Sequence, residues 1–132
     1  MYKLFFDGAC RGNPGPATSG GVIYDANGDE VDHFKTFLGE TTNNVAEYCG
    51  LLAGLNRAKA LNITHLEVYG DSNLVIQQVS GKWKVKNHRL KTIYKQIKTV
   101  EKFFTSIKYQ HVYRNKNKRA DALANEAFNL KL

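Results

Sequence analysis

Short apolar runs separated by turn residues dominate the first third of the chain and predict three strands. Residues 2–6 are apolar on both faces apart from Lys3, which is typical of a central strand in a sheet. Residues 21–24 form a second apolar run, and residues 30–38 place valine and phenylalanine among polar side chains. Because a turn at residues 25–28 joins the second run to the third, we expect an antiparallel hairpin there.

A helical repeat follows these strands. Apolar side chains recur at helical spacing up to about residue 61, at Val45, Cys49, Leu52, Leu55 and Ala58. The threonines and asparagines at residues 41–44 are candidates for the N-cap of this helix. Gly50 and Gly54 follow Glu47 on the same helix, and they either allow close packing beside this acid or only fit the helix to the sheet.

The rest of the chain alternates helices with single strands. Strands are expected over residues 65–69 and 107–113, and helices over residues 72–79, 88–104 and 120–130. The long middle helix is amphipathic, with a lysine-rich outer face. This order of elements predicts an α/β fold in which helices cover a mixed sheet.

Length and charge narrow the function classes. A chain of 132 residues suits one domain, residues 1–132, and the net charge of +7 favours a polyanionic partner. Basic residues cluster over residues 82–102 and 114–119, which favours a nucleic acid over a generic basic surface. With only Cys10 and Cys49, no signal peptide and no membrane span, we expect a reduced, cytoplasmic monomer without an obligate protein partner.

Four acids occupy corresponding places in the predicted topology. Asp7 ends the first strand ahead of a loop rich in glycine and proline, and Asp71 ends the fourth strand. Glu47 lies in the first helix, and Asp121 opens the last helix. Each acid alone could start a turn, cap a helix or interact with a helix dipole.

Together these acids indicate a metal site. Crowded carboxylates repel one another, and a bound cation removes that repulsion. Oxygen ligands suit Mg²⁺, or Mn²⁺ in its place. Two such ions about 4 Å apart could activate a water and stabilise the leaving oxygen of a phosphodiester. The pattern thus predicts phosphodiester hydrolysis without a nucleophilic side chain.

Four motifs in this order resemble ribonuclease H of type 1 across essentially the whole chain. They are Phe6-Asp7-Gly8 with Gly12-Asn13-Pro14-Gly15-Pro16, Thr41-Thr42-Asn43-Asn44 with Ala46-Glu47, Tyr69-Gly70-Asp71-Ser72, and Asn117 with Ala120-Asp121-Ala122-Leu123-Ala124. The resemblance implies a ribonuclease H-like, five-stranded mixed sheet flanked by helices. Its first three strands are antiparallel, and its last two are parallel to the first.

The same resemblance implies how the enzyme works. Asp7, Glu47, Asp71 and Asp121 would be the catalytic carboxylates and would bind two Mg²⁺ ions. The substrate would be an RNA/DNA hybrid, whose RNA strand is cut to leave 5′-phosphate and 3′-hydroxyl ends.

The resemblance also implies the substrate contacts. Facing the RNA minor groove and its 2′-hydroxyls would be Gly8, Ala9, Cys10, Gly12, Asn13 and Asn44. The 2′-hydroxyl is the group that distinguishes RNA from DNA. Thr42 and Asn43, at a helix N-terminus, would hold a DNA phosphate, although capping alone would also explain them.

Two features depart from the family pattern. Many members carry a histidine in the loop before the last acid, and residues 113–120 contain none. Arg114 is the nearest substitute by charge, or else only a solvated residue. The segment that forms a basic protrusion in some members is short here, so Lys82, Lys84 and Lys86 would form a reduced phosphate clamp. Trp83 would pack on a DNA sugar or close the core as a lid.

Other readings remain. A nuclease of the same fold could cut DNA or double-stranded RNA. A residue set that reads 2′-hydroxyls argues against a DNA target, but it excludes double-stranded RNA less firmly. A hybrid-binding module without catalysis is disfavoured, because four carboxylates without metal would only repel a phosphate backbone.

Overall fold

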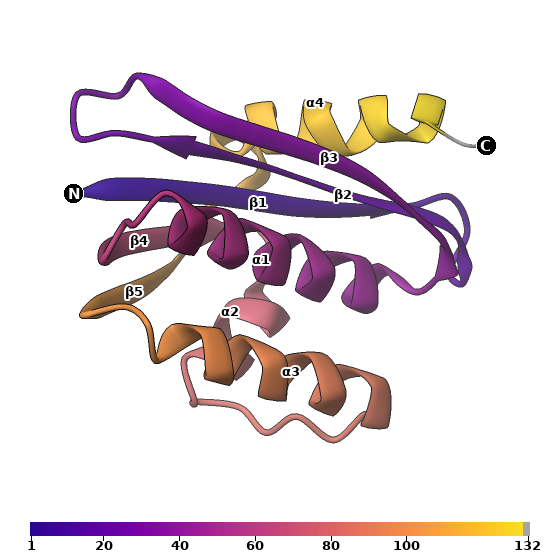
Figure 1. Cartoon of the computed structure of the whole chain (residues 1–132). Helices are drawn as coiled ribbons and strands as arrows, with labels where there is room; N and C mark the ends of the chain where they lie inside the picture. The colour runs from indigo at the N-terminus through magenta and orange to yellow at the C-terminus, as the bar shows by residue number, and fades with distance from the viewer. Residues whose placement is uncertain (131–132) are drawn as a thin grey trace.

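The computed structural model describes residues 1–130 and shows a five-stranded mixed sheet flanked by helices (Figure 1). The strands are β1 (Tyr2–Cys10), β2 (Gly15–Tyr24), β3 (Glu30–Thr41), β4 (His65–Gly70) and β5 (Ser106–His111). The helices are α1 (Asn43–Ala60), α2 (Asn73–Val79), α3 (His88–Glu101) and α4 (Lys118–Glu126), with short 3₁₀ helices η1 (Arg114–Lys116) and η2 (Ala127–Leu130).

The sheet has the order β3-β2-β1-β4-β5. β1 pairs with β2 and β2 with β3 in antiparallel fashion, whereas β4 and β5 run parallel to β1. The predicted fold class and strand directions are therefore confirmed. Within residues 1–130, no helix is both long and apolar enough to cross a bilayer.

The first two strands are longer than the sequence predicted. We expected a loop from Gly8 to Pro16, but β1 and β2 continue through most of it, with Asp7 paired to Gly20 and Cys10 to Ala17. Asp7 therefore lies inside β1 and not at its end, so that prediction was wrong. Glycines signal turns in a sequence, but here they also allow close approach, since a Cβ on Gly20 would lie 2.6 Å from the Ala124 nitrogen in α4.

Smaller differences concern the ends of the later elements. The long helix α3 ends at Glu101 and not near residue 104, and β5 ends at His111. The closing helix begins at Lys118 and passes into η2 for its last turn. Shifts of this size are usual for fraying ends, and they leave the order of elements unchanged.

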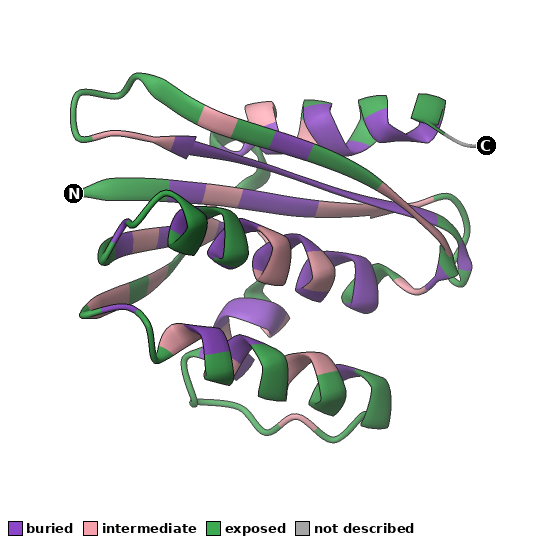
Figure 2. Cartoon of the chain, viewed as in Figure 1, coloured by how far each residue is buried: buried purple, intermediate pink, exposed green. Residues whose placement is uncertain are grey.

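Helices cover the sheet from two sides. α1 packs on β1 so closely that a Cβ on Gly54 would lie 2.6 Å from Cδ2 of Leu4. α4 lies on the opposite side, over β1 and β2 (Figure 1). Buried residues line the sides of the helices that face the strands (Figure 2), and the largest are Tyr48, Phe6, Leu4, Ile23, Leu51 and Leu55. Each fully buried side chain of this size contributes about 2 kcal/mol through burial, so this core holds α1 firmly against β1.

Candidate active site

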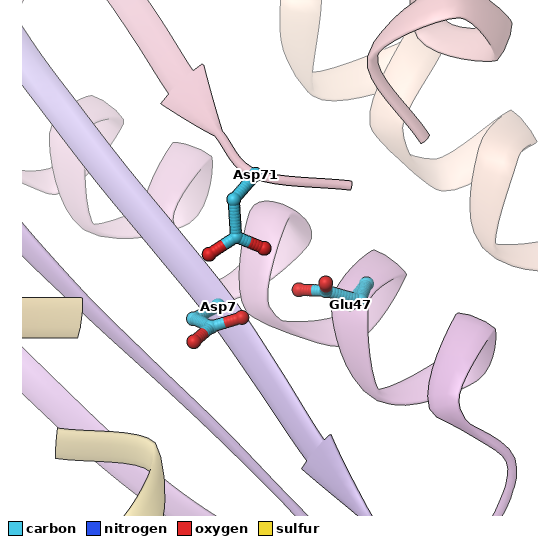
Figure 3. A group of neighbouring side chains, drawn as sticks. All are labelled: Asp7, Glu47 and Asp71. Atoms are coloured by element: carbon cyan, nitrogen blue, oxygen red, sulfur yellow. The ribbon is translucent and has the colours of Figure 1, made fainter. Parts of the chain in front are cut away.

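Three carboxylates from three different elements point toward one another (Figure 3). Asp7 comes from β1, Glu47 from α1, and Asp71 from the residue after β4; each offers one oxygen, and these oxygens lie within 4.8 Å of one another. β1 and β4 are parallel neighbours with Phe5 opposite Tyr69, which places Asp7 and Asp71 at the same level. The missing side chain of Gly50, whose Cβ would lie 2.8 Å from the Asp7 carbonyl oxygen, lets α1 bring Glu47 to that level.

Asp121 lies in the first turn of α4 and lines the same pocket. This pocket has a volume of about 480 Å³ and is also lined by the three clustered acids. The side chain of Asp121 is 33% exposed, and it is not one of the acids whose oxygens lie within 4.8 Å of one another. The structure thus gathers three of the four predicted acids and places the fourth on the wall of their pocket.

No basic side chain in residues 1–130 forms an ion pair with the three clustered acids. Burial, followed by the charge of Asp71, raises the pKa of Asp7 from 3.8 to about 7. Burial and the charge of Asp7 also raise the pKa of Glu47 well above its usual value. The backbone N–H of Gly8 donates to Asp7 Oδ1 at 2.9 Å, but Glu47 Oε1 is buried without a hydrogen-bond partner among residues 1–130. An oxygen-only donor set with an unsatisfied buried oxygen fits a hard divalent cation.

A buried asparagine orients one of these acids, and the sequence reasoning gave it no role. The side-chain N–H₂ of Asn117 donates to Asp71 Oδ2 at 3.0 Å and to the Phe6 carbonyl oxygen at 2.9 Å. Asn117 is 1% exposed and lies four residues, about one helical turn, before Asp121. That spacing is the one signal in the sequence that links this amide to the acid site.

The predicted substrate-binding residues of β1 and α1 are divided between the pocket and the hairpin tip. Lining the pocket are Gly8, Ala9 and Cys10, together with Asn43 at the start of α1. Gly12 has a φ of +88° at the tip, where a side chain would be strained.

The tip is also linked to α1. Asn13 Oδ1 accepts the backbone N–H of Asn43 at 3.1 Å. Thr42 caps α1 by accepting the Val45 N–H at 3.3 Å, so its capping role is confirmed, and Asn44 is exposed beside it. The nucleic-acid contacts of these residues stay predictions.

The basic segment between α2 and α3 lines a separate pocket of about 430 Å³. Its lining includes Lys82, Trp83 and Lys84, while Lys86 follows as an exposed residue outside that lining. Trp83 is 48% exposed, so about half of it is covered, and both of its predicted roles, on a DNA sugar or as a partly buried lid, stay predictions. Gln78 anchors the segment, because it donates to the Lys84 carbonyl oxygen at 3.0 Å.

Several pocket residues were not predicted from the sequence. Arg11, Asn125 and Phe128 line the acidic pocket, and η2, which carries Phe128, follows directly after α4. Arg114, the predicted auxiliary residue, also lines it, with Nη2 3.9 Å from Asp121 Oδ1 and an 83% exposed side chain. Outside this lining, His111 Nε2 lies 3.3 Å from the Asp71 carbonyl oxygen.

The sequence is similar to those of known proteins. A family described as "Reverse transcriptase-like" matches residues 5–127. The "Bifunctional protein Rv2228c" of Mycobacterium tuberculosis is 47% identical over 122 residues, which are 92% of this chain and 34% of that protein. The chain therefore spans about a third of the length of this relative. "Ribonuclease HI" of Halobacterium salinarum is 41% identical over 93% of this chain and 62% of its own length.

Solved structures agree with these matches. The crystal structure of RNase H1 from Halobacterium salinarum superposes with a TM-score of 0.95 at 38% identity, covering 98% of each chain. LC11-RNase H1, solved in complex with an RNA/DNA hybrid, superposes with a TM-score of 0.94 at 36% identity, again over 98% of each chain. Both likenesses extend over the strands and helices that hold the four acids.

Proposed function

The chain belongs to the ribonuclease H type 1 family, and on that premise we propose that it hydrolyses the RNA strand of RNA/DNA hybrids. The observation that carries this proposal is the cluster of Asp7, Glu47 and Asp71, which lies at the wall of an open pocket of about 480 Å³. These acids offer no nucleophile of their own, so water is the attacking group. The activity is that of a metal-dependent endonuclease.

The acids hold the reacting groups in place. Two Mg²⁺ ions, or Mn²⁺ in their place, would activate the attacking water and stabilise the leaving oxygen. Asp7, Glu47, Asp71 and Asp121 would hold these ions. Asn117 keeps one oxygen of Asp71 occupied, which leaves the other free to face the pocket.

The products follow from the bond that breaks. The water oxygen becomes bonded to phosphorus, and the bond between phosphorus and the 3′-oxygen breaks. One fragment then ends in a 5′-phosphate, and the other ends in a 3′-hydroxyl that has taken up a proton.

Three observations support the hybrid as the substrate. Gly8, Ala9 and Cys10 line the pocket beside the acids, where a 2′-hydroxyl of RNA would lie. Asn43 is exposed at the N-terminus of α1 and lines the same pocket, which suits a phosphate of the partner strand. LC11-RNase H1, which shares 36% of its sequence with this chain, binds a hybrid.

The proposal is tested with matched substrates in parallel. RNA/DNA hybrid, double-stranded RNA, single-stranded RNA and double-stranded DNA of one sequence are incubated with Mg²⁺, with Mn²⁺ or with EDTA. We expect cleavage of the hybrid in both metals, none in EDTA, and none by the Asp71→Asn variant. Asp29→Asn, an exposed acid in the turn between β2 and β3, is the matched control and should cleave normally.

Each other outcome rejects part of the proposal. An intact hybrid in both metals rejects the activity. Faster cleavage of double-stranded RNA than of hybrid assigns the site to the alternative substrate. Cleavage by the Asp71→Asn variant at the normal rate rejects the carboxylate cluster as the active site.

A further inference from the structure

Arg11 lies at the tip of the β1–β2 hairpin, and its side chain lines the acidic pocket. We propose that it binds a phosphate of the nucleic-acid strand in this pocket, next to the phosphate that is cleaved. The nature of that strand rests on the proposed function. The assignment of Arg11 rests on three features of the structure: its backbone, its aromatic support and the charges around it.

The backbone of Arg11 is held on both sides. Its N–H donates to the Pro16 carbonyl oxygen at 2.8 Å across the hairpin tip. Its carbonyl oxygen lies so close to Gly15 that a Cβ there would be 2.1 Å away. The thiol of Cys10, the preceding residue, lies within hydrogen-bond distance of the carbonyl oxygens of Gly12 and Thr41, with the Thr41 oxygen at 3.2 Å. The starting point of the Arg11 side chain is therefore fixed relative to β1.

The far end of the same side chain is supported by an aromatic ring. The guanidinium carbon of Arg11 lies 3.9 Å from the centroid of the Phe128 ring. Phe128 is 8% exposed and lies in η2, which packs against β2 and β3. When a guanidinium lies over an aromatic ring, the N–H groups in its own plane stay free and can donate to an anion.

The charges of the pocket indicate which anion this is. Four carboxylates line the pocket, and yet Arg11 forms no ion pair with any acid in residues 1–130. The other pocket arginine, Arg114, lies 3.9 Å from Asp121 Oδ1 and is thus directed to an acid. A strand whose cleaved phosphate lies at the acids would bring its neighbouring phosphate to the pocket wall. Arg11, stacked and without an acid partner, is suited to bind that phosphate in bidentate fashion.

The first test measures binding at several salt concentrations. All proteins carry Asp71→Asn so that the hybrid stays intact. Arg11→Ala should raise Kd about tenfold and lower the slope of log Kd against log salt by about 0.8, which is one phosphate contact.

A variant of Phe128 separates the charge of Arg11 from its contact with the aromatic ring. Phe128→Leu keeps the charge and removes the ring, so Kd should rise about threefold with an unchanged slope. Lys59→Ala is the matched control. Lys59 also lies near an aromatic ring, with Nζ 5.8 Å from the centroid of Phe103, but it belongs to the last turn of α1 and does not line the acidic pocket. Its Kd and slope should not change.

The second test locates the phosphate. Hybrids with one uncharged methylphosphonate linkage, moved stepwise along each strand, are compared on the parent and on Arg11→Ala. We expect one linkage beside the cut to weaken binding to the parent about tenfold and to have no effect on Arg11→Ala. The cut position comes from cleavage by the protein without Asp71→Asn.

Two kinds of result would overturn the assignment of Arg11 to a phosphate. An unchanged salt slope in Arg11→Ala, or a loss of thermal stability without loss of affinity, assigns Arg11 to packing of the hairpin tip against η2 and overturns the proposal. Equal effects of every linkage in both proteins overturn it as well. Because binding is measured without cleavage, a protein that cuts no hybrid would reject the proposed function and still report on Arg11.

Discussion

Replacement of Asp7 by asparagine should stabilise the metal-free protein at neutral and alkaline pH. The carboxylate is 4% exposed and lies in one cluster with Glu47 and Asp71, so its ionised form is costly. Asparagine is nearly isosteric, carries no charge, and its Oδ1 can still accept the Gly8 N–H, which now donates to Asp7 at 2.9 Å. The substitution thus removes the charge and keeps the local hydrogen bond.

The size of the effect follows from the pKa of Asp7. Raising this pKa from 3.8 to about 7 means that the native state holds its proton more tightly than the unfolded state does. Stability is then fully present below about pH 4 and is lost as pH rises to about 7. At pH 8 the penalty reaches at most about 4 kcal/mol, and at pH 4 it falls to about 0.6 kcal/mol. Glu47 and Asp71 share the repulsion, so a gain of about 2–4 kcal/mol is expected at pH 8.

Urea unfolding in EDTA measures this directly. At pH 8 the Asp7→Asn variant should unfold at higher urea than the unsubstituted protein, with the same slope, and at pH 4 the two should nearly coincide. Asp29→Asn, an exposed acid, should show no such pH-dependent gain. Adding Mg²⁺ at pH 8 should raise the midpoint of the unsubstituted protein more than that of the variant.

One result would refute this reasoning. A variant that is less stable than the unsubstituted protein in EDTA at pH 8 would mean that Asp7 is compensated within the protein. The cluster would then be a structural network, and its fit to a divalent cation would lose its physical basis.

Three further predictions concern the residues around the acids. Asn117→Ala should lower kcat about tenfold and leave KM nearly unchanged, because Asp71 loses the amide 3.0 Å away; steady-state cleavage checks this, and a change in KM alone would contradict it. Gly8→Ala should destabilise the fold by about 3 kcal/mol, because its Cβ would lie 2.5 Å from the backbone of Ala46 and Glu47; a thermal midpoint within about 2 °C of the unsubstituted protein would show that α1 can shift freely. Replacing Lys82, Lys84 and Lys86 together by alanine should weaken hybrid binding and lower its salt slope by up to about 2.5, and an unchanged affinity would reject the phosphate clamp.

The order and type of the elements could be predicted from the sequence because the apolar periodicity is strong. Alternating strands and the repeat in α1 gave the mixed sheet, and the motifs around Asp7, Glu47 and Asp71 led to the cluster that the structure shows. These features are local, or they follow from topology. In parallel neighbouring strands, residues at matching levels must meet.

The features that could not be predicted from the sequence have a different cause. Gly8 was interpreted as a loop residue, because a sequence does not distinguish a glycine that turns the chain from one against which a helix packs. The roles of Asn117 and Arg11 depend on contacts between residues far apart in the chain, from the segment before α4 to Asp71 and from η2 to the hairpin tip. No periodicity encodes such contacts. They become visible only when side chains are placed.

The central claim, that the carboxylate cluster cuts RNA in a hybrid, is tested most directly by mapping the products. An RNA/DNA hybrid labelled in the RNA strand is incubated with Mg²⁺ and with either the unsubstituted protein or Asp71→Asn, and the fragment ends are identified. The account predicts 5′-phosphate and 3′-hydroxyl ends from the unsubstituted protein and intact RNA with the variant. Fragments ending in 2′,3′-cyclic phosphate, or equal cleavage by both proteins, would contradict it.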